Sequence, residues 1–303
     1  MKTIITGSSG FVGKNLTAHL DKQNIEVQDL SLRATDWKNH INKPATAIIH
    51  LAGKAHDTAN TSSADEYFKV NRDLTIELFN EFLKSNIQDF FFFSSVKAVA
   101  DTVDGVLYED IMPKAVIPYG QSKLEAETYL LNQKLPAGKR LFIIRPCMIH
   151  GAGNKGNLNL LYKVVEKGIP WPLAAFENQR SFLSIDNLSF LIVEMLRNIE
   201  VASGIYNFAD DETISTNQLI KIIGKVSGRK TNLWNISSSL INGIAKIGDK
   251  LKLPLNSERL KKLTESYVVS NKKIKTALNI NKLPLSAEEG LVKTIQSFVN
   301  SEL

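Results

Sequence analysis

The glycine-rich segment at the N-terminus is the feature that most constrains the fold of this chain. Residues 2–6 form a short apolar run, and Gly7, Gly10 and Gly13 follow it before a helix-forming run over 14–22. A strand, a glycine loop and a helix start in this order are the context in which proteins bind a dinucleotide pyrophosphate. Gly7 would permit the turn, Gly10 the approach of a phosphate to the helix N-terminus, and Gly13 close packing of helix on strand. The spacing is G-x-x-G-x-x-G, and a plain turn is the alternative.

Strands and helices alternate along the chain, which predicts an α/β fold with a doubly wound parallel sheet. The predicted strands are residues 2–6, 25–30, 45–51, 89–95, 140–145 and 204–208. The predicted helices are 14–22, 66–85 after a capping-box pattern at Ser63, the run from Tyr119, 157–167, a helix capped by Asp186 through Arg197, 215–227, 237–249 and 286–300, with 96–118 as a loop. The rhythm changes after Gly153 and becomes mostly helical after Thr213. We therefore predict a dinucleotide-binding domain at 1–156 plus 185–212 and a smaller substrate domain at 157–184 plus 213–303.

Composition excludes several classes of function. The net charge of +6 is scattered, without the long Lys/Arg block that tracks a nucleic acid, and a mild positive balance suits anionic small molecules such as nucleotides. Cys147 is the single cysteine, so no internal disulfide is possible, and a reducing, cytoplasmic location is expected. No signal peptide, membrane-spanning run or metal cluster is predicted. The helix 237–249 has apolar and lysine faces that could touch a membrane surface, although packing on the small domain is the simpler interpretation.

The spacing of Tyr119 and Lys123 predicts a proton-transfer pair. Residues four apart on a helix share a face, with about 5–6 Å between their Cβ atoms. A nearby ammonium favours the phenolate, so we expect Lys123 to lower the pKa of Tyr119 toward working pH. Chance placement of both residues on a surface helix is the alternative. The strand at 89–95 ends in Ser94 and Ser95, whose hydroxyls would lie at the carboxyl edge of the sheet, where one can hydrogen-bond a substrate oxygen.

Histidines and ribose-binding residues are less clearly assigned. His50 is expected to be a strand residue rather than a catalyst, whereas His56 and Asp57 in the following loop could meet substrate. The end of the second strand normally contacts the adenosine ribose, where an acid selects NAD. This chain has Ser31 and Arg33 there, which suit a 2′-phosphate better. Asp29 competes for that role but is expected to face away from the ribose. NADP(H) is therefore favoured, and NAD(H) stays possible.

Together these features resemble the extended short-chain dehydrogenase/reductase family, the nucleotide-sugar epimerases and dehydratases in particular. The resemblance extends over nearly the whole chain. It rests on Thr6-Gly-Ser-Ser-Gly-Phe-Val-Gly13, His50-Leu-Ala-Gly53, Phe93-Ser-Ser95, Tyr119-Gly-Gln-Ser-Lys123, Arg145-Pro146, His150-Gly151 and Arg180-Ser-Phe-Leu-Ser-Ile-Asp186. It implies a Rossmann-type sheet with a small C-terminal domain that binds the nucleotide sugar.

The resemblance also implies roles for individual residues. Tyr119 would be the catalytic acid/base, Lys123 its activator and ribose ligand, and Ser95 the hydroxyl partner, with Ser94 as a less favoured alternative. The implied cofactor contacts are Gly7, Gly10, Phe11, Val12, Gly13, Ala52, Gly53, Asn71, Ser94 and Pro146. The implied substrate contacts are Lys97, His150, Asn157, Arg180 and Arg259, with Arg180 gripping the sugar nucleotide's pyrophosphate.

Departures from the family pattern narrow the expected reaction. Dehydratases carry Asp-Glu beside the catalytic hydroxyl, but here Ser95 is followed by Val96-Lys97. The stretch 178–187 resembles the branch acting on UDP-N-acetylhexosamines. With Ser31 and Arg33, these features favour a 4-reductase of a UDP-4-keto-6-deoxy-N-acetylhexosamine. The resemblance implies a homodimer that forms through the helices at 66–85 and 119–133. A UDP-N-acetylglucosamine-type 4-epimerase is the alternative. A cofactor-sensing non-enzyme and a small-alcohol dehydrogenase are more distant alternatives.

Overall fold

Six parallel strands form the main sheet of this protein. The computed structural model describes residues 1–41, 44–54, 63–154, 156–251 and 256–301. The sheet has the order β2-β1-β3-β4-β6-β9 and consists of β1 (Lys2–Thr6), β2 (Glu26–Leu30), β3 (Ala47–His50), β4 (Asp89–Phe93), β6 (Arg140–Pro146) and β9 (Gly204–Phe208). All five neighbouring pairs are parallel. The predicted doubly wound α/β fold is therefore confirmed.

The strand order reverses at β1. β2 lies on one side of β1, whereas β3, β4, β6 and β9 lie on the other side. Ligands of open α/β sheets bind beyond the carboxyl ends of the strands at such a reversal. The loops that follow β1 and β3 therefore meet at the expected binding position.

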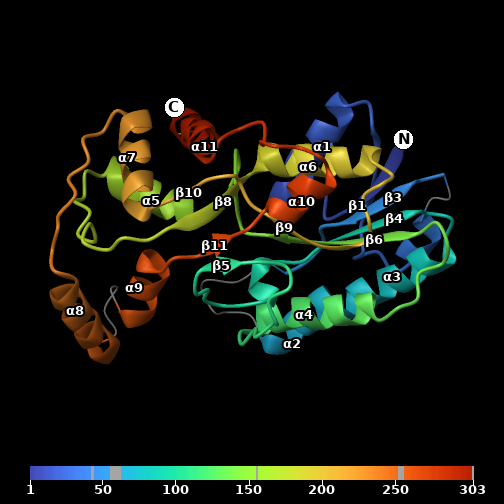
Figure 1. Cartoon of the computed structure of the whole chain (residues 1–303), viewed down its shortest axis with the longest axis horizontal. Coiled ribbons are helices and arrows are strands. Elements are labelled where there is room, and N and C mark those ends of the chain that lie inside the picture. Colours follow the sequence, from blue (N-terminus) through green and yellow to red (C-terminus); the bar gives the residue numbers. More distant parts are fainter. Residues whose placement is uncertain (42–43, 55–62, 155, 252–255, 302–303) are drawn as a thin grey trace.

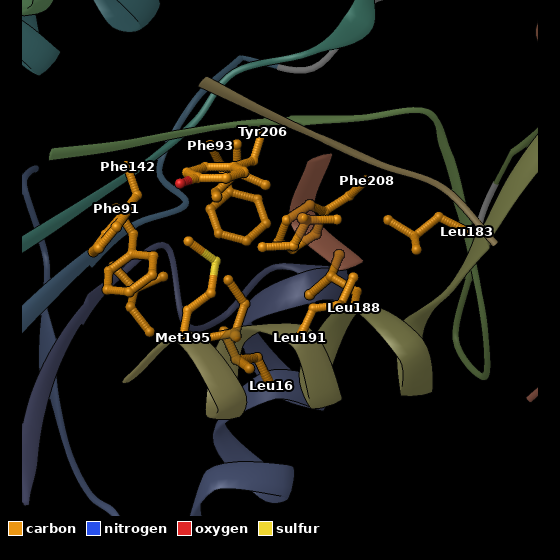
Figure 2. Close-up of a cluster of buried hydrophobic side chains, with 14 of the residues drawn as sticks. Leu16, Phe91, Phe93, Phe142, Leu183, Leu188, Leu191, Met195, Tyr206 and Phe208 are labelled. Atoms are coloured by element: carbon orange, nitrogen blue, oxygen red, sulfur yellow. The ribbon is translucent and has the colours of Figure 1, made fainter. Parts of the chain in front are cut away.

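The strands are apolar throughout because both faces of the sheet are covered by helices. Phe91 and Phe93 pack on the face of α1 (Phe11–Lys22) and α6 (Ile185–Arg197), together with Leu16, Leu188 and Met195 (Figure 2). Phe90 and Phe92 alternate to the other face, toward α3 (Leu74–Lys84) and α4 (Pro118–Leu131). In Figure 1, α1 and α6 lie above the sheet, and α3 and α4 lie below it.

A second hydrophobic cluster lies in the smaller, mostly helical part. It is formed mainly by α5 (Asn157–Glu166), α7 (Thr216–Ser227), α8 (Ser238–Leu251), α9 (Ser257–Thr264), α11 (Ala287–Ser301) and the sheet β10-β8-β7 (Thr213–Ile214, Arg180–Ser184, Met148–His150). Residues of this cluster come from 158–182 and from 214–298. Within the second of these ranges, however, Val269 of β11 (Val268–Val269) and Ile274 of α10 (Lys272–Ala277) pack with the core of the large sheet. The predicted domain limits remain a prediction.

Three local predictions need correction. The helix predicted at 66–85 consists of α2 (Ala64–Tyr67), the π-helical turn η2 (Phe68–Asp73) and α3. Ser63 caps it as predicted, accepting from the Glu66 amide at 3.4 Å. The N-cap of α6 is Ser184 and not Asp186, because the Ser184 hydroxyl accepts from the Asn187 amide at 3.1 Å. The predicted loop 96–118 contains η3 (Val96–Ala98) and β5 (Val106–Leu107), which pairs with β11.

Neither a membrane-spanning helix nor a metal-binding cluster occurs among the described residues. No helix among them combines the length and apolar character needed to cross a bilayer. No group of three or more His, Cys, Asp or Glu side chains within the same described ranges is arranged to hold a metal ion.

Candidate active site

The glycine loop packs against the end of β3. Gly7 has a φ of +74°, and a Cβ atom there would lie 2.7 Å from the Ala52 amide nitrogen. A Cβ atom at Gly13 would lie 2.3 Å from the Gly7 carbonyl oxygen. Both positions therefore require glycine, one for its backbone conformation and both for the close approach. The structure brings the predicted residues Gly7, Gly13 and Ala52 together.

The start of α1 suits a diphosphate. Gly10 is the N-cap and offers no side chain to accept from the first amides of the helix, which begins with Phe11 and Val12. Uncapped amides at a helix N-terminus attract anions. This donor set fits the pyrophosphate of a dinucleotide.

Tyr119 and Ser95 meet at the carboxyl edge of the sheet. Ser95 follows β4 and is 8% exposed, and its hydroxyl is hydrogen-bonded to the phenol of Tyr119 near the start of α4. The Lys97 amide donates to the Ser95 hydroxyl at 3.2 Å and helps to orient it. The ring of Tyr67 lies edge-on to that of Tyr119, with centroids 6.1 Å apart. The predicted partnership of phenol and hydroxyl is thus present in the geometry.

The expected lowering of the Tyr119 pKa by Lys123 is not found. Burial raises the pKa of the phenol, and the hydrogen bond from Ser95 opposes that rise. The Lys123 ammonium instead donates to the Phe93 carbonyl of β4 at 2.8 Å. The i, i+4 spacing places both residues on one helix face, but the lysine side chain extends to β4.

Lys123, Asn71 and Gly53 converge beside this pair. A Cβ atom at Gly53 would lie 3.0 Å from Asn71 Oδ1 and 3.2 Å from Lys123 Nζ. The Asn71 amide accepts from Lys54 N at 2.7 Å and donates to Lys54 O at 3.1 Å, so it fixes the loop after β3. Asn71 lies on the π-helical turn, and such turns are frequent at functional sites. The same amide donates to the Ser122 hydroxyl of α4 at 3.2 Å.

Stability should depend on the titration of Lys123. Burial lowers the Lys123 pKa from 10.5 to about 8, and Glu127 opposes this shift. Between pH 8 and 10.5 the unfolded chain binds more protons at Lys123 than the folded chain does. The free energy of unfolding therefore rises with pH in this range, and burial of Lys123 destabilises the protein most below pH 8. Between about pH 7.5 and 9.5, wild type should gain about 1–2 kcal/mol in free energy of unfolding relative to Lys123→Met, measured by urea denaturation. Equal pH dependence in the two proteins would contradict the shift, and Lys84→Met, at a side chain 71% exposed, is the control.

Ser94 does not face the candidate site. Its hydroxyl donates instead to Glu127 of α4, so the assignment of Ser94 as a cofactor ligand is not supported. Glu127 also accepts from Arg145, at 2.5 Å from Nη2 and 3.0 Å from Nε. The Glu127 and Arg145 side chains are 1% and 2% exposed. Sequence reasoning missed this buried ion pair, although Tyr119, Lys123 and Glu127 recur at four-residue spacing on one helix face.

A cationic group is formed by Arg180 of β8 and Lys97 of η3. The Arg180 guanidinium of β8 donates to the Lys262 carbonyl of α9 at 2.6 Å. The Lys97 ammonium donates to the Asp101 carbonyl at 2.7 Å and lies 4.2 Å from the centre of the Tyr267 ring. Burial lowers the pKa of Lys97, and the charge of Arg180 is among the further causes, so the two cations are close. The structure therefore brings together two of the predicted substrate ligands.

The other predicted substrate ligands are not part of this group. His150 is fully buried, with Nδ1 2.8 Å from the Thr294 hydroxyl and Nε2 3.7 Å from Asp210, because β7 places it in the interior. Asn157 and Arg259 are exposed at the starts of α5 and α9.

Three further predictions concern residues next to the site. Pro146 is buried at the end of β6, in register with Phe208. His50 is buried between the hydroxyls of Thr6 at 2.7 Å and Thr75 at 2.9 Å, as expected of a strand residue. Burial lowers the His50 pKa to about 3, with a smaller contribution from Lys123. His56 and Asp57 lie outside the described residues.

The end of β2 differs from the expected arrangement. Asp29 was expected to face away from the nucleotide, but its carboxylate accepts from the Ser8 hydroxyl of the glycine loop at 2.5 Å. The Asp29 side chain therefore points toward the glycine loop. Ser31 and Arg33 are both exposed just beyond the strand.

Comparison with known proteins gives a consistent result. A profile described as the NAD dependent epimerase/dehydratase family matches residues 3–209. A Vibrio cholerae protein named UDP-glucose 4-epimerase is 27% identical, with 98% of this chain and 95% of the relative aligned. An Escherichia coli O157:H7 protein named N-acetyl-alpha-D-glucosaminyl-diphospho-ditrans,octacis-undecaprenol 4-epimerase is 26% identical, with 99% and 96% aligned. The solved structure of RMD from Pseudomonas aeruginosa, complexed with NADPH, has a TM-score of 0.76 at 19% identity, with 99% of each chain covered.

Proposed function

The chain belongs to the NAD-dependent epimerase/dehydratase family, and from this premise we propose that it reduces the C4 keto group of a UDP-4-keto-6-deoxy-N-acetylhexosamine. The observation that carries this proposal is the hydrogen-bonded Tyr119–Ser95 pair at the carboxyl edge of the sheet. The pair lies beside Lys123 and the Gly53 turn, at the position where this type of sheet binds a dinucleotide. A bound nicotinamide cofactor would supply the hydride.

The chain's own residues would manage the proton and the developing charge. Tyr119 holds the proton that passes to the sugar O4, and Ser95 hydrogen-bonds the same oxygen as it becomes an alkoxide. Lys123, oriented by the Phe93 carbonyl, would hold the ribose hydroxyls next to Gly53. Arg180 and Lys97 would bind the substrate diphosphate, since Arg presents a fork of donors to phosphate oxygens. Elimination of water is not supported, because no carboxylate directly follows Ser95.

The cofactor proposed for this reaction is NADP(H). Exposed Ser31 and Arg33 beyond β2 support it, because a guanidinium forms charge-assisted hydrogen bonds with a 2′-phosphate. Asp29 is the feature that favours NAD(H), and its hydrogen bond to Ser8 already occupies one carboxylate oxygen.

A 4-epimerase is the second candidate, and the names of the Vibrio cholerae and Escherichia coli relatives favour it. The same active-site residues would serve, with hydride returned to the opposite face of the sugar. The name of the E. coli relative also shows that a sugar diphosphate can be carried by a polyprenol, and Arg180 would serve either carrier. We retain a nucleotide-sugar substrate as the first proposal, and a homodimer through α2, α3 and α4 as a prediction.

One assay separates the two candidates. Purified protein is incubated with the UDP-4-keto-6-deoxy-N-acetylhexosamine and NADPH or NADH, and absorbance at the nicotinamide band is followed with product analysis. We expect stoichiometric consumption of NADPH, with a higher kcat/KM than for NADH. In parallel, UDP-N-acetylglucosamine is incubated without added cofactor. Interconversion of this sugar with its C4 epimer would contradict the reductase proposal and support the 4-epimerase.

A further inference from the structure

Helix α8 carries an apolar stripe that the fold does not bury. Leu240, Ile244, Ile247 and Leu251 are 58%, 42%, 55% and 65% exposed. At 100° per residue these four positions fall within an arc of about 60°. The neighbouring stripe of Ile241 and Ala245 is 3% and 1% exposed and already attaches the helix to the small domain. α8 therefore has a second apolar face, beyond the one that its packing requires.

The charges around this stripe match an anionic partner. Lys246 and Lys250 are exposed on the polar side of the helix next to the stripe, and neither forms a salt bridge with another described residue. The chain as a whole has a net charge of +6. The acidic residue of this region, Asp249, accepts from the Ser257 amide at 2.9 Å and its hydroxyl at 2.6 Å, which ties α8 to α9.

The position of α8 connects this surface with the cationic group of the site. In Figure 1, α8 projects at the lower left, away from the large sheet, with α9 between it and β5. The carbonyl of Lys262 on the same α9 accepts from Arg180. A surface bound by α8 would thus lie one helix away from the guanidinium that we assign to the diphosphate.

We propose that the stripe Leu240–Ile244–Ile247–Leu251 docks the protein on an anionic lipid bilayer, with α8 lying in the plane of the interface. A helix with an aliphatic face and flanking lysines has the chemistry of such interfacial helices. Symmetric pairing with a second copy is less suitable, because a two-fold contact would bring the same lysines of both copies together. The docking itself does not depend on which reaction the site performs.

The test is flotation of the purified full chain with phospholipid vesicles. We expect binding to vesicles of phosphatidylcholine with about 30 mol% phosphatidylglycerol, and weak binding to pure phosphatidylcholine, since anionic lipid attracts lysines near the surface. Raising NaCl from about 0.05 to 0.5 M should weaken the binding. Ile244→Asp and Ile247→Asp should each lower the partition coefficient by at least about tenfold, because each removes a large apolar side chain from the interface.

Ile199→Asp is the matched control. It makes the same chemical and charge change at a side chain that is 78% exposed, just after α6 on the large domain. We expect it to bind vesicles like wild type, and all three variants to unfold at the wild-type temperature.

The proposal is overturned if the wild-type protein does not bind anionic vesicles, or if Ile199→Asp loses as much binding as the variants of α8. It is also overturned if Ile247→Asp changes the oligomeric state by light scattering without altering vesicle binding. Turnover of a soluble nucleotide sugar should be unchanged in these variants, so failure of the docking and failure of the proposed reaction are distinguishable.

Discussion

Tyr119→Phe is expected to lower kcat by a factor of about 10² to 10⁴, the usual contribution of a positioned general acid or base. The substitution removes only the phenolic hydroxyl and leaves the ring in contact with Tyr67. It therefore deletes the proton donor next to Ser95 without opening the site. The measurement is single-turnover reduction of the keto sugar by saturating NADPH. Cofactor affinity from fluorescence titration should change little, because the glycine loop and Lys123 are intact.

Tyr129→Phe is the matched control for this prediction. Tyr129 lies on the same helix, and its hydroxyl donates to Asn80 at 3.1 Å, outside the candidate site. Loss of this hydroxyl should leave kcat near the wild-type value. Wild-type turnover by Tyr119→Phe, or equal losses in both variants, would show that the phenol of Tyr119 does not carry the proton.

The parts of the site that the sequence predicted well depend on short-range patterns. The strand, glycine loop and helix start lie within a few residues of one another, and Tyr119 is related to Lys123 by one helical turn. The turn conformation at Gly7 and the packing at Gly13 follow from this local order. The carboxyl ends of parallel strands at one edge predicted the position of Ser95. That Tyr119 is its partner was implied by the resemblance to the family.

The parts that were predicted poorly depend on contacts between distant segments. Ser94 and Ser95 are adjacent, and extended backbone turns their side chains to opposite sides. Only the position of α4 decides that Ser95 meets Tyr119 whereas Ser94 meets Glu127. His150 ends β7 and was expected to contact substrate, but α11 covers it through Thr294, far away in the sequence. No local pattern distinguishes these outcomes.

The direction of the Lys123 side chain also explains why the pKa of Tyr119 differs from the expected one. The i, i+4 rule gives the separation of Cβ atoms but not the direction of a four-carbon side chain. Lys123 extends to the Phe93 carbonyl, and burial of the phenol then dominates the Tyr119 pKa. The raised pKa keeps the phenol protonated, which is the form that the proposed reduction requires of a proton donor.

Glu127→Gln is expected to destabilise the protein by about 3–5 kcal/mol, the usual cost of removing one partner of a buried ion pair. The variant keeps the shape of the side chain but leaves Arg145, 2% exposed, without its counter-charge. It also alters the acceptor of the Ser94 hydroxyl, so both buried partners of Glu127 lose part of their pairing. The measurement is the free energy of unfolding from urea denaturation. Because Glu127 raises the Lys123 pKa, the variant should also shift the titration of Lys123 to lower pH.

Glu125→Gln separates this effect from a general sensitivity of α4. Glu125 is two residues earlier on the same helix, 49% exposed, and pairs with Arg72 at 2.7 Å. An exposed pair of this kind contributes about 0–1 kcal/mol, so its loss should be small. The two variants make the same chemical change and differ chiefly in burial. Equal destabilisation by both, or a wild-type stability for Glu127→Gln, would show that the Glu127–Arg145 pair does not hold α4 against β4 and β6.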